Sequence, residues 1–80
     1  MKLVSFRVRT PIGIFTRVGA IHRQQIVDLN MAYVRWLTDQ QEAQPYRLAN
    51  AQVPPTMLEF LEGGDSTLAA ARRAKDYVTT

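Results

Sequence analysis

An 80-residue chain with 46% hydrophobic and 21% charged residues has room for one small globular domain, and this composition excludes a disordered protein. The absence of cysteine excludes a disulfide framework and thiolate metal sites. The net charge is +3, but the basic residues are spread along the chain instead of being concentrated on one element, which argues against nucleic acid as a partner.

The N-terminal segment has the alternating pattern of a β-strand. In residues 2–9, Val4, Phe6 and Val8 occupy every second position and polar residues lie between them. This period of two is typical of a half-buried strand. The Thr-Pro-Ile-Gly sequence at residues 10–13 predicts a turn, because proline restricts φ and glycine accepts positive φ.

Two further strands are predicted after this turn. Residues 14–21 are rich in β-forming residues and contain Gly19, which indicates a bulge or a close backbone approach. Polar residues 22–25 predict a second turn, and residues 26–29 a short third strand. Two short connections favour an antiparallel meander, since a parallel crossover needs about a dozen residues or more.

The hydrophobic period then changes to that of a helix. Asp28 or Asn30 can cap its N-terminus, and the helix should end near Gln41. Its apolar stripe consists of Leu29, Tyr33 and Leu37, with Ala32 and Trp36 beside them. Residues 42–52 are predicted to form a polar connection that contains Pro45, with Tyr46 and Leu48 as anchors on the core.

Two shorter helices are predicted in the remainder of the chain. Prolines at 54 and 55 suit a helix start, and Thr56 and Glu59 have the spacing of a capping box. The Gly-Gly pair at 63–64 should end this helix. Asp65 or Ser66 would then cap a last helix over residues 67–78. The predicted fold class is therefore α+β: a small antiparallel β-meander of about three strands followed by two or three helices.

The cellular location is predicted from the apolar stretches. Arg7 and Arg9 interrupt the N-terminal apolar run too early for a signal peptide. No later stretch approaches the ~18 apolar residues of a membrane span. We therefore expect a cytoplasmic protein that does not bind a membrane.

The sequence offers no catalytic constellation. His22 is the only histidine, in a predicted turn without further metal-ligating residues near it. Glu59 and Glu62 could share a cation, but capping and solvent exposure explain them more simply. No hydroxyl residue has a neighbouring base. We therefore expect no catalytic, cofactor-binding or metal-binding residues in this chain.

Three aromatic residues leave two interpretations open. Tyr33, Trp36 and Tyr46 could stack on a ligand, or they could be core residues at helical spacing. Core packing is the simpler explanation, because an apolar stripe of this period usually faces the interior.

Taken in their order along the chain, these segments resemble the N-terminal domain of the fumarylacetoacetate hydrolase family, and the resemblance covers the whole chain. Residues 1–7 resemble the family's first strand, and residues 10–21, with their Arg-Val-Gly step, resemble its second. Residues 26–33 are similar to the junction between strand and helix. Residues 53–63 (VPPTMLEFLEG) resemble the short helix, and residues 69–78 the helix after it. The resemblance is closest to bacterial members often labelled 2-hydroxyhepta-2,4-diene-1,7-dioate isomerases.

This resemblance implies that residues 1–80 are a single N-terminal accessory domain and that the family's catalytic domain is absent from this chain. Carboxylates of that missing domain would bind Mg or another divalent metal. The complete enzyme would hydrolyse, isomerise or decarboxylate acylpyruvate-like 2-oxo acids, with the metal polarising the oxo-acid group. We expect the chain to continue beyond Thr80, because no glycine C-cap or polar tail follows the last predicted helix.

The resemblance also implies the partners of the domain. It would pack against the catalytic domain of the same enzyme, support a homodimer and line one side of the active-site entrance. Arg7, Arg9 and Arg17, around the hairpin at 10–17, are the candidate contacts with anionic substrate or with the second domain. Arginine suits carboxylates because its planar group can donate two parallel hydrogen bonds. The alternative is that these arginines face solvent or form structural ion pairs.

Two other functions stay open at this point. A stand-alone basic module would bind nucleic acid or an acidic protein, and duplex binding would weaken with salt by a log–log slope of about −0.9 per neutralised phosphate. An independent regulatory subunit would instead co-purify with a separately encoded catalytic chain.

Overall fold

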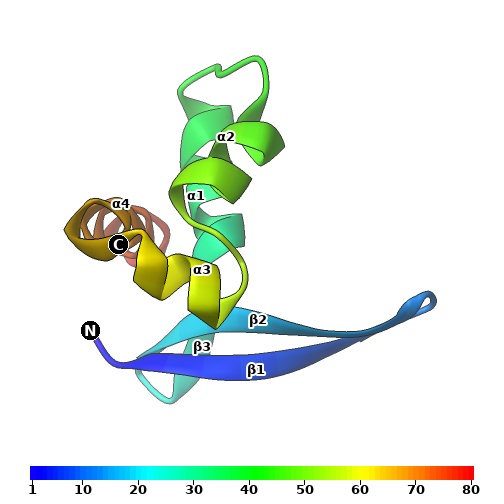
Figure 1. Cartoon of the computed structure of the whole chain (residues 1–80). Helices are drawn as coiled ribbons and strands as arrows, with labels where there is room; N and C mark the ends of the chain where they lie inside the picture. Colours follow the sequence, from blue (N-terminus) through cyan, green and yellow to red (C-terminus); the bar gives the residue numbers. More distant parts are fainter.

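The computed structural model describes residues 1–80 as three strands followed by four helices (Figure 1). In chain order the elements are β1 (Leu3–Thr10), β2 (Gly13–His22), β3 (Gln25–Asp28), α1 (Leu29–Asp39), α2 (Pro45–Gln52), α3 (Met57–Glu62) and α4 (Gly64–Thr79). The predicted α+β class is confirmed, with a β-meander preceding the helices. The additional helix, α2, is one that the sequence did not predict.

The strands form one antiparallel sheet in the order β1-β2-β3. β1 pairs with β2 along its whole length, from Leu3 opposite Ala20 to Thr10 opposite Gly13. β3 is short and pairs only with the last part of β2, residues 19–22. The outer half of the β1–β2 hairpin therefore has no third strand beside it, and Figure 1 shows it running out beyond the helices.

Both predicted turns are present. In the first, the Thr10 hydroxyl donates a hydrogen bond of 2.9 Å to the Gly13 carbonyl. In the second, Arg23 and Gln24 both have positive φ, at 49° and 67°. Two central residues of positive φ match the right-handed twist of the strands that they join.

Gly19 lies in a regular part of the ladder, where the predicted close approach is found and no bulge interrupts the pairing. A Cβ at this position would lie 2.5 Å from Ile26 Cγ2 and 2.9 Å from the Val27 carbonyl oxygen. Both distances are shorter than normal contacts, so only glycine allows β3 to lie this close.

Gly19→Ala is expected to destabilise the fold by about 1–3 kcal/mol, because the added methyl group must displace backbone atoms of β3. Urea unfolding would show a lower midpoint at an unchanged slope. Thr16→Ala, at an exposed position of the same strand, is the control and should change stability by less than about 0.5 kcal/mol. Equal midpoints for the two variants would contradict the packing argument.

α1 begins where the hydrophobic period changes. The Asp28 carboxylate accepts a hydrogen bond of 3.2 Å from the Met31 N–H, so Asp28 is the N-cap residue. The helix buries Leu29, Tyr33 and Leu37 as predicted. It therefore carries the stripe that packs mainly against α4 and α2, and to a smaller extent against the sheet.

α2 corrects the prediction that residues 42–52 form a polar connection between two helices, because residues 45–52 are themselves helical. Pro45 occupies the first turn, where its missing N–H is not needed. Ala49 is buried and Leu48 is half-buried against the core, whereas Tyr46 is exposed and is not an anchor. Two apolar contacts are too few to give the sequence a clear helical period, and packing on α1 stabilises the helix.

The start of α3 and the junction with α4 differ in detail from the prediction. The Thr56 hydroxyl donates directly to the Glu59 carboxylate at 2.8 Å, without a side-chain bond to the backbone. Gly64 takes the expected left-handed conformation, with φ of 62°. α4 begins at Gly64 itself, before the predicted start, and neither Asp65 nor Ser66 caps it.

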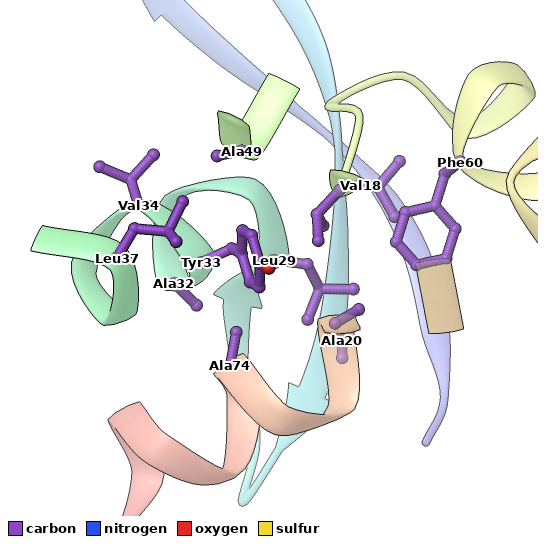
Figure 2. Close-up of a cluster of buried hydrophobic side chains, with 12 residues drawn as sticks. Val18, Ala20, Leu29, Ala32, Tyr33, Val34, Leu37, Ala49, Phe60 and Ala74 are labelled. Atoms are coloured by element: carbon purple, nitrogen blue, oxygen red, sulfur yellow. The ribbon is translucent and has the colours of Figure 1, made fainter. Parts of the chain in front are cut away.

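The core lies between the helices and one face of the sheet, and Figure 2 shows the side chains of this cluster. Its largest fully buried side chains are those of Phe60, Leu29, Val18 and Val53. Alanines of the sheet, α1, α2 and α4 fill the spaces between them: Ala20, Ala32, Ala49, Ala71 and Ala74. The interior therefore depends on a few large residues, and its packing is sensitive to each of them.

Candidate functional site

The three candidate arginines lie on two faces of the sheet. By the register of β1 and β2, Arg7 and Arg9 belong to the same face as buried Val18. They lie beyond the helices, and both are exposed. Arg17 is opposite Phe6 and therefore belongs to the other face. The structure does not bring the three arginines together in one site.

Arg17 is engaged within the domain. Its Nε donates to Asp28 Oδ2 at 2.6 Å, and its Nη2 donates to Asn30 Oδ1 at 2.9 Å and to Asp28 Oδ1 at 3.3 Å. Asn30 is buried, and its amide group donates to the Val53 carbonyl at 2.9 Å and to Asn50 Oδ1 at 3.0 Å. This network joins β2 to the start of α1 and to the C-terminal end of α2, so the contacts of Arg17 fit the structural alternative.

Arg17→Ala is expected to destabilise the fold by about 1–3 kcal/mol, because it leaves a partly buried carboxylate and a buried amide oxygen without their donor. Thermal or urea unfolding would measure this loss. Arg9→Ala is the matched control, because Arg9 forms no ion pair, and it should have almost no effect. Full stability of Arg17→Ala with altered turnover in a complete enzyme would instead place Arg17 at a substrate site.

The sheet face turned away from the helices carries a set of apolar side chains beside the Arg17–Asp28 ion pair. Its apolar residues, assigned by the strand register, are Val4, Phe6, Val8, Phe15, Ile21 and Ile26. No helix covers this side of the sheet in Figure 1, and Phe15 is 47% and Ile26 51% exposed. An antiparallel sheet with one face in solvent normally carries polar residues on that face. We call these six residues the outer apolar face.

The alternating apolar residues of β1 lie on the outer apolar face and not on the face that the helices cover. The sequence correctly predicted that Val4, Phe6 and Val8 share one face. The helices, however, cover the opposite face, through Val18 and Ala20. The apolar residues of the alternating pattern are thus the ones that this chain's own helices leave uncovered.

Other candidate side chains do not converge. His22 is half-buried at the end of β2, Glu59 is engaged by Thr56, and Glu62 is exposed on α3. No group of three or more His, Cys, Asp and Glu side chains is placed to hold a metal ion. These residues therefore offer no arrangement from which a catalytic step can be derived.

The three candidate aromatic residues do not form one ligand-stacking set, because Tyr46 lies apart from Tyr33 and Trp36. Tyr33 is buried and donates a hydrogen bond to Gln52, while Tyr46 is exposed on α2. Trp36, half-buried, stacks on Tyr33 with 5.4 Å between ring centroids, and the Arg73 guanidinium lies 5.5 Å from its centroid. The bond from Tyr33 joins α1 to α2, and the cation–π contact of Arg73 with Trp36 joins α4 to α1.

A surface cluster that the sequence did not reveal connects α1 to α4. The Tyr77 hydroxyl and Arg35 Nε donate to Asp39 Oδ2 at 2.5 and 3.0 Å, beside an open hollow of about 430 Å³. The bond from Tyr77, followed by that from Arg35, lowers the pKa of Asp39. The same bond raises the pKa of Tyr77, because ionisation would remove the donated proton. No pattern in the sequence indicated the contact between Asp39 and Tyr77, since the two residues are far apart in the chain.

Tyr77→Phe is expected to raise the pKa of Asp39 toward its ordinary value, because the strongest donor to the carboxylate is lost. An NMR titration of the carboxyl carbon would measure it. The folded-state pKa is lowered, so the cluster stabilises the fold above the ordinary carboxyl range and this contribution disappears as pH falls through the lowered pKa. Tyr46→Phe is the control, and an equal Asp39 pKa in both variants would contradict the assignment.

Comparison with known proteins finds no similar protein. No family model, curated protein or solved structure matches the chain. Its helices are also too short or too polar to cross a membrane. The arguments that follow therefore depend on the sequence and on the geometry of the sheet.

Proposed function

We propose that this chain is the accessory N-terminal domain of a fumarylacetoacetate hydrolase-like enzyme and that it docks on the catalytic domain through the outer apolar face. The assignment to this family is supported by the resemblance of the sequence segments in their order along the chain. The observation that carries the docking role is the uncovered apolar face of the sheet. Contiguous exposed apolar surface of this kind typically marks an interaction site.

The packing of the domain explains why a covering partner is needed. The helices bury one side of the sheet around Val18 and Ala20. On the other side, Phe6 and Ile26 cover Gly19 but are themselves partly exposed. A second layer of protein against this face would give the sheet the usual two-sided burial of a domain core.

The proposal assigns chemistry and support to different domains. The catalytic domain would hold Mg or another divalent metal through its carboxylates and act on acylpyruvate-like 2-oxo acids by hydrolysis, isomerisation or decarboxylation. The present domain would hold the catalytic domain in place, support the homodimer and line one side of the active-site entrance. None of its residues is assigned a catalytic step.

The first test is the intact mass and activity of the natural polypeptide that contains this sequence. The proposal expects a mass several times 9.1 kDa and turnover of an acylpyruvate that stops when EDTA removes the metal. A 9.1 kDa polypeptide without turnover would contradict it. That outcome would favour a stand-alone module or a separate regulatory subunit.

A variant pair tests the docking face in that polypeptide. Phe15→Asp places a charge in the outer apolar face and should lower the melting temperature, because a desolvated charge would lie at the domain interface. Leu58→Asp is the matched control, since Leu58 is 72% exposed on α3 and outside that face. Equal melting temperatures would place the catalytic domain elsewhere.

A further inference from the structure

The outer half of the β1–β2 hairpin is an exposed arm. We define the arm as residues 7–16, which have no third strand and no helix against them (Figure 1). Ile12, at its tip, is 86% exposed, and Ile14 is 59% exposed. Large aliphatic side chains at such exposure on a projecting element are suited to a groove on another molecule.

Two unpaired arginines accompany these apolar residues. Arg9 is directly opposite Ile14 in the ladder, and Arg7 is two positions away on the same face. Neither arginine has a carboxylate within ion-pair distance, whereas Arg17 is held by Asp28 and Arg35 by Asp39. One face of the arm thus presents two free guanidinium groups around an exposed isoleucine.

The charged residues of the β1–β2 hairpin are all basic. Every acidic residue lies at or after Asp28, so the hairpin contains no carboxylate. The basic residues of this part are Lys2, Arg7, Arg9, Arg17 and Arg23. Electrostatic complementarity therefore selects a partner with carboxylates around the groove that accepts the arm.

We infer that the arm binds a protein surface on which Asp or Glu carboxylates border an apolar groove, with Ile12 and Ile14 in the groove and Arg7 and Arg9 paired to the carboxylates. This inference rests on the proposed function and deepens it, because it adds a contact on the opposite face of the hairpin from Val8 and Phe15 to the docking through the outer apolar face. Arginine is favoured at such contacts because its planar group pairs with carboxylates in a fixed geometry.

Other occupants fit the arm less well. Two copies meeting arm to arm would bring like charges together, and an arm bound to the helices of another copy would form an open chain of molecules. Two free arginines also fall short of the basic clusters of about four to eight residues that bind anionic membranes. They would neutralise few phosphates of a nucleic acid.

Carbodiimide cross-linking tests the inference in the natural polypeptide. This reagent joins an amine to a carboxylate only when the two are in contact. Arg7→Lys and Arg9→Lys place an amine on the arm, and Arg23→Lys, in the opposite turn of the sheet, is the matched control. Mass spectrometry of the digested product identifies both ends of each new amide bond.

The expected result is a link from position 7 or 9 to an Asp or Glu outside residues 1–80, without a corresponding link from position 23. Links at 7 and 9 that are no more frequent than at 23, or links to a second copy of these 80 residues, would overturn the inference. Binding to anionic phospholipid vesicles or to a labelled DNA duplex that is lost in Arg7→Gln/Arg9→Gln, with no cross-link, would overturn it as well.

The two proposals can fail separately. A 9.1 kDa polypeptide without turnover whose arm links to a different protein contradicts the proposed enzyme and supports the arm's acidic partner. A longer, active enzyme with no link at position 7 or 9 supports the proposed enzyme and contradicts the arm's acidic partner.

Discussion

Replacing Phe60 with alanine is expected to destabilise the domain by about 3–5 kcal/mol, the cost of removing a large buried aromatic side chain and leaving a cavity. Phe60 is 1% exposed and is the only buried residue of α3, a helix of six residues. Figure 2 shows its ring in the same cluster as Val18 and Ala20 of β2. Without this ring, α3 loses its main attachment to the core.

The effect of losing the Phe60 ring should extend beyond α3 to the edge of the sheet. The connection that precedes this helix accepts a hydrogen bond of 2.9 Å from the Val18 N–H through the Pro55 carbonyl. Release of α3 would weaken that bond and expose the edge of β2 where β3 has ended. Since small domains have a total stability of about 5–15 kcal/mol, we expect Phe60→Ala to lose a large share of its stability and to melt at a markedly lower temperature.

Circular dichroism during thermal unfolding would measure this effect. Leu61→Ala is the matched control, because the neighbouring Leu61 is 60% exposed on the same helix. Its melting temperature should stay close to that of the parent protein. Similar melting temperatures for both variants would mean that α3 is not attached through Phe60.

Asn30→Leu is expected to destabilise the domain by about 2–4 kcal/mol, although leucine has a similar branched shape and is more hydrophobic. The amide group of Asn30 satisfies the Val53 carbonyl and binds Asn50, and its oxygen accepts from Arg17. Leucine would leave the buried carbonyl and the guanidinium without these partners. The cost of unsatisfied buried groups therefore exceeds the gain from apolar burial.

A double-mutant cycle separates this network from local effects. If Arg17 and Asn30 act together, the loss in Arg17→Ala/Asn30→Leu should be smaller than the sum of the single losses, as measured by urea unfolding. Asn50→Ala is a milder comparison, because Asn50 is exposed and its side-chain oxygen accepts only one bond from Asn30. Strictly additive losses would contradict a connected network.

Local sequence patterns were sufficient for most of the secondary structure. The alternation in β1, the glycine and proline turns and the change of period after Asp28 each depend on neighbouring residues, and the meander and α1 follow from them. The close approach at Gly19 was also visible as a glycine inside a strand. α2 was missed because its eight residues place only Ala49 and Leu48 against the core, too few for a recognisable period.

The candidate site was less predictable because it depends on contacts between distant segments. The sequence grouped Arg7, Arg9 and Arg17 by their nearness in the chain, but strand register assigns Arg17 to the opposite face and to Asp28. The bond between Asp39 and Tyr77 joins residues 38 positions apart. An asparagine in the first turn of an apolar helix was the one sign of the network that the sequence offered, and its burial became visible only in the structure.

By itself, the sequence determined that this chain is a small α+β domain whose first strand has one apolar and one polar face, because these properties follow from residue type and local spacing. Only the tertiary structure decided which face the helices cover. The helices attach through Val18, Ala20 and Leu29, on the side opposite Val4, Phe6 and Val8. That choice depends on how distant segments pack together, and it leaves the outer apolar face and the arm exposed.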